Sequence, residues 1–281
     1  MAGNTTNFAP ILTPEQVGEL VIQPLIAESI AGQVLTAVTT DSHDYRIPVV
    51  EQDPSASWTA EGAEIAVSDA TVDEVLVTPS KLAALSVITR ELANDSSPAA
   101  AEIVGQGIVR DLVRKVDQAL FTATTTNGPG GIPGVSGIST VDAGIAYGSV
   151  DAFSDAIYTA AGFNGAISAW VTNPATAKTL AKVKEATGSN KPLLGPDPTV
   201  PGRRQILGIP LLTSPYVTTT DDTVWGISAA YSYMVIREQA EVESDRSVYF
   251  TSDRVAIRAT LRIGFGFPAP ATLVRITTSE A

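Results

Sequence analysis

The sequence has no cysteine and only one histidine, His43, among its 281 residues. Disulfides, thiolate catalysis and zinc ribbons are therefore excluded, and little remains for a histidine metal site or a Ser-His-Asp triad. No apolar run approaches the about 20 residues of a membrane-spanning helix, and the stretch MAGNTTNFAP has no basic segment. We therefore expect neither a membrane partner nor an export signal.

Basic residues are also scarce. The 18 lysines and arginines are outnumbered by 30 carboxylates, which gives a formal charge of -12. This balance is unfavourable for general binding to nucleic acid or to an anionic membrane. Most of the basic residues are arginines, with 12 against 6 lysines, and arginine suits fixed ion pairs and interfaces.

Three of these arginines lie close together near the end of the chain. In RVAIRATLRIGFGF, residues 254–267, Arg254, Arg258 and Arg262 fall on even positions, whereas the odd positions from 255 to 263 are apolar. Successive side chains of a strand point to opposite faces, so the pattern predicts a strand with an apolar face and an arginine face. The arginines would pair with acidic residues of their hairpin partner, residues 238–245, or contact a neighbouring subunit.

A second, longer hairpin is predicted nearer the N-terminus. HDYRIPVVEQ and DATVDEVLVTP are typical of strands, and the segment between them holds small and acidic residues around Trp58. Such a hairpin has little apolar surface of its own. Because an isolated hairpin is marginally stable in water, this one needs another surface to lie on.

Two helices are predicted in the first half of the chain. One begins near Thr13 and is broken at Pro24. The longest carries an apolar residue every fourth position from Ile108 to Leu120, begins near Ser96 or Ser97, and ends at the glycines from Gly128 onward.

A compact α/β unit follows the long helix. It comprises a helix over 149–162, a buried strand over 166–172, and a helix that Asn173-Pro174 should start and Gly188 should end. Residues 191–208 are rich in proline and glycine, which predicts a loop. Further strands are expected within 209–214 and 222–238, and TLVRIT closes the chain.

Three features suggest chemistry, and each has a simpler explanation. NGPGGIPG has the glycines of a phosphate loop, but it follows a helix and lacks the Gly-Lys-Ser/Thr ending, which favours a helix stop and a turn. His43 lies beside Asp41 and Asp44 without a nucleophile motif, so a surface turn is the simpler interpretation. Glu61 and Glu64 lie in an extended acidic loop, which is either solvated or in contact with basic groups elsewhere.

Taken together, these segments resemble the major capsid proteins of tailed bacteriophages, which have the Hong Kong 97 type of shell fold. The longest similar stretch is WTAEGAEIAVSDATVDEVLVTPSKLAALSVITRELANDS. DQALFTATTTNGPGGIPG, WVTNPATAKTLAKVKEATG and DRVAIRATLRIGFGFPAPATLVRI are similar to later parts of that family. The similar segments occur in the family's order over roughly residues 45 to 275.

The resemblance implies an α+β, Hong Kong 97-like fold with five parts. They are an N-terminal arm (1–44), an extended hairpin loop (45–80), a peripheral domain with the long helix (81–148), an axial domain (149–235), and return strands of the peripheral domain (236–281). Contacts between subunits are then expected at Trp58, Glu61, Glu64, Lys81, Arg90, Arg254, Arg258 and Arg262.

The resemblance also implies a structural protein of the virion capsid, with no enzymatic activity, cofactor or metal. Copies would self-assemble as hexamers and pentamers into an icosahedral head that encloses double-stranded DNA without sequence-specific binding. Further partners would be a portal protein and a separate scaffolding or cement protein. Because only about 40 residues precede the first hairpin strand, we expect no removable scaffolding segment.

Two alternatives remain open at this point. An encapsulin shell would have the same fold and would purify with a cargo protein, whereas a soluble α/β enzyme would form a small oligomer with an apolar pocket. Certain members of the capsid family also crosslink a lysine of the extended loop to an asparagine of a neighbouring subunit. This chain has no lysine between Arg46 and Lys81 and no asparagine after Asn190, so we expect no such crosslink.

Overall fold

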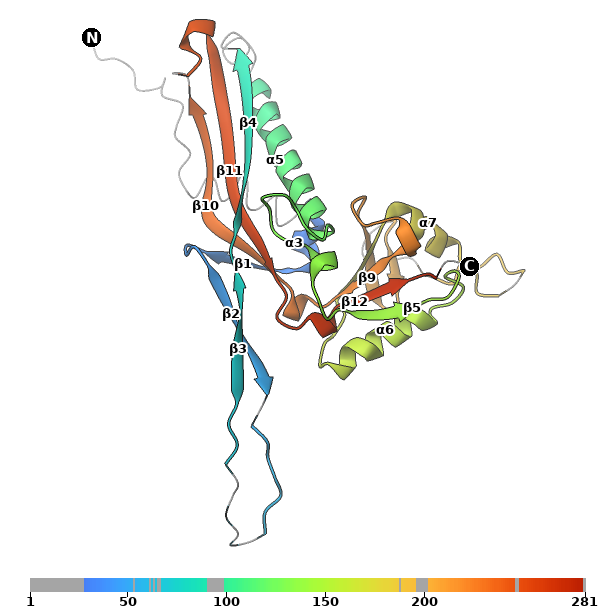
Figure 1. The fold of residues 1–281 in the computed structure, drawn as a ribbon. Helices are drawn as coiled ribbons and strands as arrows, with labels where there is room; N and C mark the ends of the chain where they lie inside the picture. Colours follow the sequence, from blue (N-terminus) through green and yellow to red (C-terminus); the bar gives the residue numbers. More distant parts are fainter. Residues whose placement is uncertain are drawn as a thin grey trace.

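The structure is a computed structural model that describes residues 28–52, 54–60, 62, 64, 67–89, 99–186, 188–195, 202–245 and 248–279. Several sequence-based predictions fall outside these residues: the helix from Thr13, the helix cap at Ser96 or Ser97, and the subunit contacts at Glu61 and Arg90. The described chain is elongated and branched (Figure 1): a long sheet backed by one helix, a hairpin that extends beyond the sheet, and a compact unit to one side.

The long sheet has four strands in the order β1-β10-β11-β4. They are β1 (Thr36–Thr40), β10 (Tyr233–Asp245), β11 (Arg254–Gly266) and β4 (Ser80–Thr89). β11 is antiparallel to both of its neighbours, and β1 is parallel to β10. The short helix α3 (Ile30–Val34), capped by Ser29, precedes β1.

The helix α5 (Ala99–Leu120) covers one face of this sheet, as its sequence pattern predicts. Leu112, Val116 and Leu120 are buried, because a residue every fourth position keeps one face of a helix turned to the sheet. The apolar positions Ala259, Leu261 and Ile263 of β11 pack in the same core. The predicted strand with one apolar face is therefore confirmed.

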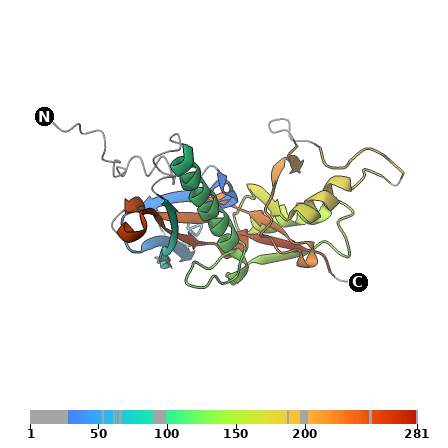
Figure 2. The ribbon, with the colours of Figure 1, turned by 90° about the horizontal axis from the view of Figure 1, so that it is seen from above.

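The compact unit is built on a six-stranded sheet, β5-β12-β9-β6-β8-β7. Its elements are β5 (Ser139–Asp142), α6 (Asp151–Gly162), β6 (Ala169–Thr172), α7 (Pro174–Lys182), β7 (Arg204–Ile206), β8 (Ile209–Thr213), β9 (Val224–Ile227) and β12 (Val274–Thr277). β5 and β12 lie outside the range 149–235 in the sequence. They join this sheet because β12 pairs antiparallel with β9 and in parallel with β5. Figure 2 separates this unit from the long sheet.

Two predictions in this unit are wrong. The helix that starts at Asn173 ends at Lys182 and not at Gly188, because the backbone of 183–185 pairs with that of 191–193 in a small hairpin. Gly188 lies in the turn of that hairpin. The loop predicted over 191–208 contains the strand β7, which pairs with β8 through a turn at Leu207-Gly208, both with positive φ.

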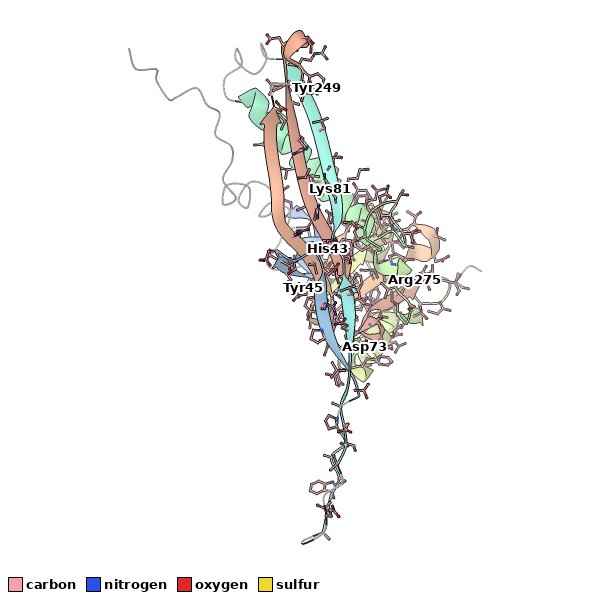
Figure 3. All side chains as sticks on the ribbon, turned by 60° about the vertical axis from the view of Figure 1, so that its left-hand side comes forward. His43, Tyr45, Asp73, Lys81, Tyr249 and Arg275 are labelled. Carbon is pink, nitrogen blue, oxygen red and sulfur yellow. The ribbon has the colours of Figure 1, made fainter. Side chains whose placement is uncertain are left out.

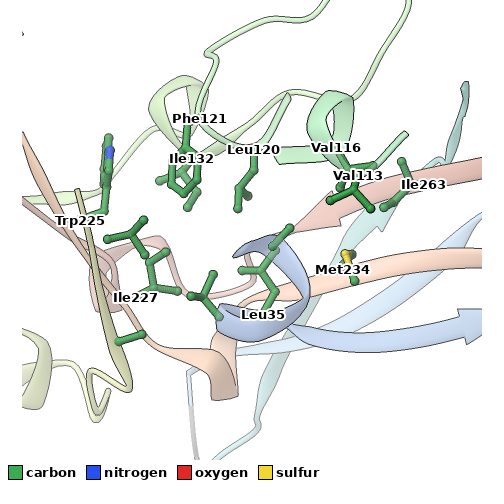
Figure 4. Packing of buried hydrophobic residues seen from close by; sticks show 14 of the residues in the cluster. Leu35, Val113, Val116, Leu120, Phe121, Ile132, Trp225, Ile227, Met234 and Ile263 are labelled. Carbon is green, nitrogen blue, oxygen red and sulfur yellow. The ribbon is translucent and has the colours of Figure 1, made fainter. Parts of the chain in front are cut away.

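One core joins the long sheet to the compact unit (Figure 4). Leu35, Val116 and Met234 from the long sheet and its helices lie in the same cluster as Trp225 and Ile227 of β9. A second core lies within the compact unit, where the fully buried Trp170 stacks edge-on against Phe153 with ring centroids 5.1 Å apart. The shared core fixes how the two sheets lie relative to each other.

The turn after α5 packs backbone against backbone. An added Cβ at Gly131 would lie 2.2 Å from the carbonyl oxygens of Ala119 and Leu120, and one at Gly134 would lie 2.3 Å from that of Ala123. The turn has one 3-10 element, η3 (Ile132–Gly134). The glycines of NGPGGIPG thus allow close packing on the end of a helix, which confirms the predicted helix stop.

We expect Gly131→Ala to lower the free energy of unfolding of the isolated subunit by about 3 kcal/mol, because a methyl group must displace two helix carbonyls. Urea denaturation measures the loss. Gly130→Ala is the matched control: its Cβ would lie 3.5 Å from the nearest atom, the oxygen of Ala123, and should be nearly neutral. Equal stabilities of the two variants would contradict the packing described here.

Within the described residues, none of the helices combines the length and the apolar character needed to cross a membrane.

Candidate functional site

The extended hairpin consists of β2 (Tyr45–Gln52) and β3 (Thr71–Val77), paired antiparallel as predicted. Only its base lies on the long sheet, where Ile47 and Val77 pack against Val235. Gly266 of β11 makes this contact close: an added Cβ would lie 2.7 Å from Ile47 Cδ1 and from Val77 Cγ2. The absence of a side chain at Gly266 therefore allows the base of the hairpin to pack closely on β11.

His43 and Asp44 belong to the closure of this base. Thr78, after β3, donates a hydrogen bond of 2.7 Å to Asp44 Oδ1, and His43 Nδ1 lies 2.9 Å from the same oxygen. Both hydrogen bonds lower the pKa of Asp44 below its usual value, and the bond from Thr78 has the larger effect. His43 is exposed, as expected for a turn histidine.

Beyond its base, the hairpin exposes apolar side chains. Trp58 is fully exposed, Val67 nearly so, and Val50, Val72 and Leu76 are each more than half exposed. Glu64 is also exposed. Exposed apolar residues gathered on one element mark an interaction surface, because a monomer gains nothing from keeping them in water. The hairpin extends beyond the end of the long sheet, as the positions of Asp73 in β3 and Lys81 in β4 show in Figure 3.

The arginines of β11 have different cross-strand neighbours. The register places Arg258 opposite Glu243 of β10, and Arg258 has an interaction partner. Arg262 lies between Arg237 of β10 and Lys81 of β4. Acidic pairing within the hairpin, one of the two predicted roles, therefore fits the register of Arg258 but not that of Arg262.

Arg254, at the start of β11, is exposed and lies opposite Thr89 of β4.

One polar residue of structural importance was missed from the sequence. Asp117 of α5 is buried and accepts hydrogen bonds from the backbone N–H groups of Ile30 (3.1 Å) and Ala31 (3.0 Å). It thus holds the start of α3 against the long helix. Burial raises the pKa of Asp117, and the two backbone hydrogen bonds partly oppose that rise. The signal was its position, one turn after Val113 on the buried side of the helix.

We expect Asp117→Ala to lower the free energy of unfolding by about 2 kcal/mol, because it leaves two backbone donors without an acceptor. Asp111→Ala, at an exposed position of the same helix, is the control and should be neutral within about 0.5 kcal/mol.

The raised pKa gives a second readout. The folded chain binds this proton more tightly than the unfolded chain, so ionisation of Asp117 costs stability as the pH rises from the ordinary aspartate pKa through the folded value. Asp117→Ala should remove that contribution from the pH dependence of unfolding. A pH profile unchanged from the wild type would contradict this role.

The described residues contain no group of three or more histidine, aspartate or glutamate side chains placed to hold a metal ion.

Comparison with known proteins identifies the fold. A model of the phage capsid family matches residues 10–277. The capsid of a native GTA particle is similar with a TM-score of 0.71 at 16% identity, over 99% of this chain and 95% of that chain. The structure from Microbacterium phage Oxtober96 gives 0.72 at 14% identity over 99% and 96%. That from Gordonia phage Cozz gives 0.69 at 19% identity over 90% and 87%.

At these identities the similar structures establish the fold, and the Hong Kong 97-like α+β architecture expected from the sequence is confirmed. No curated protein sequence matches this chain significantly. The encapsulin and enzyme alternatives are not favoured, because the matched family and the similar structures are those of capsids. Since the family model covers nearly the whole sequence, this chain belongs to the phage capsid family and is a structural subunit of a virion capsid.

Proposed function

We propose that this chain is the major capsid protein of a phage head, which assembles as hexamers and pentamers into an icosahedral shell around double-stranded DNA. The observation that carries the proposal is the hairpin, whose base packs on its own subunit through Ile47, Val77 and the partly buried Val75, and which exposes Trp58 completely. A two-stranded hairpin of this kind is stable when another surface covers it. Neighbouring subunits of a shell supply that surface.

The charge of the chain supports packaging of DNA without binding to it. The formal charge of -12 is unfavourable for binding phosphate, which fits a shell in which the genome slides during packaging. We propose a portal protein as the entry point for that DNA. A separate scaffolding or cement protein completes the proposed set of partners, and the subunit has a structural role without catalysis.

Negative-stain microscopy of the expressed and purified protein tests the proposal. We expect closed shells of uniform size, built from ring-shaped capsomers, and no protein cargo in the purified particles. Small oligomers alone, both for the chain by itself and after co-expression with the portal and scaffolding genes of its phage, would overturn the proposal. Shells that co-purify with one stoichiometric cargo protein would favour an encapsulin.

A further inference from the structure

The basic residues of the chain are concentrated on one part of the compact unit. Residues 174–206 carry six cations and two carboxylates, a net charge of +4, whereas the whole chain carries -12. The six cations are Lys178, Lys182, Lys184, Lys191, Arg203 and Arg204. A chain that is acidic elsewhere therefore has a local excess of positive charge here.

The helix α7 presents two of these cations to solvent. Lys178 and Lys182 are exposed and four residues apart, so they project from the same side of the helix, while Leu180 points into the core of the compact unit. Like charges at this spacing destabilise a helix. The helix dipole favours a cation in the last turn, which accounts for Lys182 but not for Lys178. The pair therefore does not serve the stability of α7 alone.

The small hairpin of residues 183–193, which follows α7, adds two more lysines. Lys184 is exposed, and its Nζ donates a hydrogen bond of 3.1 Å to the backbone oxygen of Asn190. Lys191, on the facing strand, forms an ion pair with Glu185, with Nζ 3.0 Å from Oε2. We give the name lysine surface to the exposed residues Lys178, Lys182, Lys184 and Lys191.

Most of the charge on the lysine surface is not neutralised by the described part of the chain. Within that part, Lys178, Lys182 and Lys184 have no carboxylate partner, and Glu185 neutralises only Lys191. The surface lies on the side of the compact unit that faces away from the long sheet (Figure 1). Several ammonium groups on one accessible surface attract an anion that carries several charges.

The lysine surface has the chemistry of an interface with nucleic acid. The described residues of 174–206 include no exposed large apolar side chain, whereas the extended hairpin exposes Trp58 and Val67. Protein interfaces are anchored by aromatic and apolar side chains, but interfaces with DNA are polar and strongly positive. Residues 174–206 also contain no Phe, Tyr or Trp on which the bases of a single strand could stack. The ligand that fits is the phosphate backbone of a duplex.

We propose that the lysine surface binds the phosphate backbone of duplex DNA. The proposal rests on the proposed function and adds the place where the packaged genome contacts the shell, which puts this side of the compact unit in the interior. Lysine binds phosphate as a point charge, so the contact does not depend on base sequence. The acidic remainder of the chain confines binding to this surface, and a few phosphate contacts per subunit exchange readily as the genome slides.

Titration of a fluorescently labelled DNA duplex with the purified, unassembled full-length protein tests the proposal by anisotropy at low salt. Lys178→Gln with Lys182→Gln and Lys184→Gln should weaken binding about tenfold or more. The slope of log K against log salt concentration should fall by about 3, because each lysine neutralises one phosphate. Arginine at the same three positions keeps the charge and should keep the binding.

Two further variants separate a local contact from a general effect of charge. Arg110→Gln with Arg114→Gln and Lys115→Gln removes the same charge from exposed positions of α5 and should keep the wild-type slope. Glu185→Gln removes the carboxylate partner of Lys191, so binding should tighten and the slope should rise by about 1. This gain does not depend on how well the glutamine variant of the lysine surface folds.

Each outcome bears on the proposal. It is overturned if the wild type does not bind the duplex at low salt, if the lysine variant binds as the wild type does, or if the α5 variant loses as much. A lysine variant that keeps its melting temperature but forms no shells would assign the surface to a contact between subunits and also overturn it. A wild-type chain that forms no shells would instead refute the proposed function.

Discussion

Mature particles boiled in detergent should run as a single band near the subunit mass of 29.2 kDa. A covalent shell of the lysine-asparagine kind needs an amine in the extended loop and a carboxamide on the neighbouring subunit. The hairpin has no lysine between Arg46 and Lys81, and no asparagine follows Asn190, so β10, β11 and β12 have no acceptor. Both reactants are absent from the positions where the family has them.

Lys81 does not substitute for the missing amine. An amine attacks only when it is neutral, which requires a dry site that lowers its pKa. Lys81 is exposed and lies at the base of the hairpin, opposite Arg262. Denaturing electrophoresis and intact-mass spectrometry of mature particles check the prediction, with unassembled subunit as the control. A ladder of covalent oligomers would show that the chain uses another pair of residues.

Noncovalent contacts must then hold the shell together. Shells should therefore dissociate in denaturant to intact subunits.

Several elements of the fold could be predicted because short-range pattern determines them. The four-residue repeat from Ile108 to Leu120 fixes which side of α5 is buried, and Asn173-Pro174 fixes the start of α7, where the Asn173 side chain accepts from the N–H groups of Ala175 and Thr176. The alternation along residues 254–263 likewise determines the two faces of β11. In each case the local pattern and the tertiary packing agree.

Other elements depend on partners that are distant in the sequence. β1 and β7 are short and have weak patterns of their own, and they exist as strands because β10 and β8 pair with them. The helical pattern puts Asp117 on the buried side of α5, but it does not reveal that Asp117 caps a helix 86 residues earlier in the chain. The strand register places Arg262 between two cations and Arg258 opposite Glu243. The even spacing of the arginines in the sequence could not distinguish these two surroundings.

The second large effect concerns the tip of the hairpin. Replacing residues 53–70 by Asn-Gly should abolish shells and leave a well-folded subunit. Gln52 and Thr71 are paired at the end of the ladder, and Asn-Gly forms the two-residue turn that such a pair accepts. Most described residues of this segment are exposed, and its one described hydrogen bond joins Ser68 Oγ to Ser55 O. The isolated subunit therefore loses little when the segment is removed.

The shorter loop should even stabilise the subunit, since closing 2 residues instead of 18 costs about 2 kcal/mol less in chain entropy. Stability and assembly would then change in opposite directions, which no general folding defect produces. A chain whose residues 53–70 are replaced by a glycine-serine segment of equal length is the matched control. It keeps the reach and loses Trp58 and the carboxylates, so its failure to assemble would assign the effect to side-chain contacts. Normal shells from the shortened chain, seen by microscopy and sedimentation, would contradict the role of the hairpin.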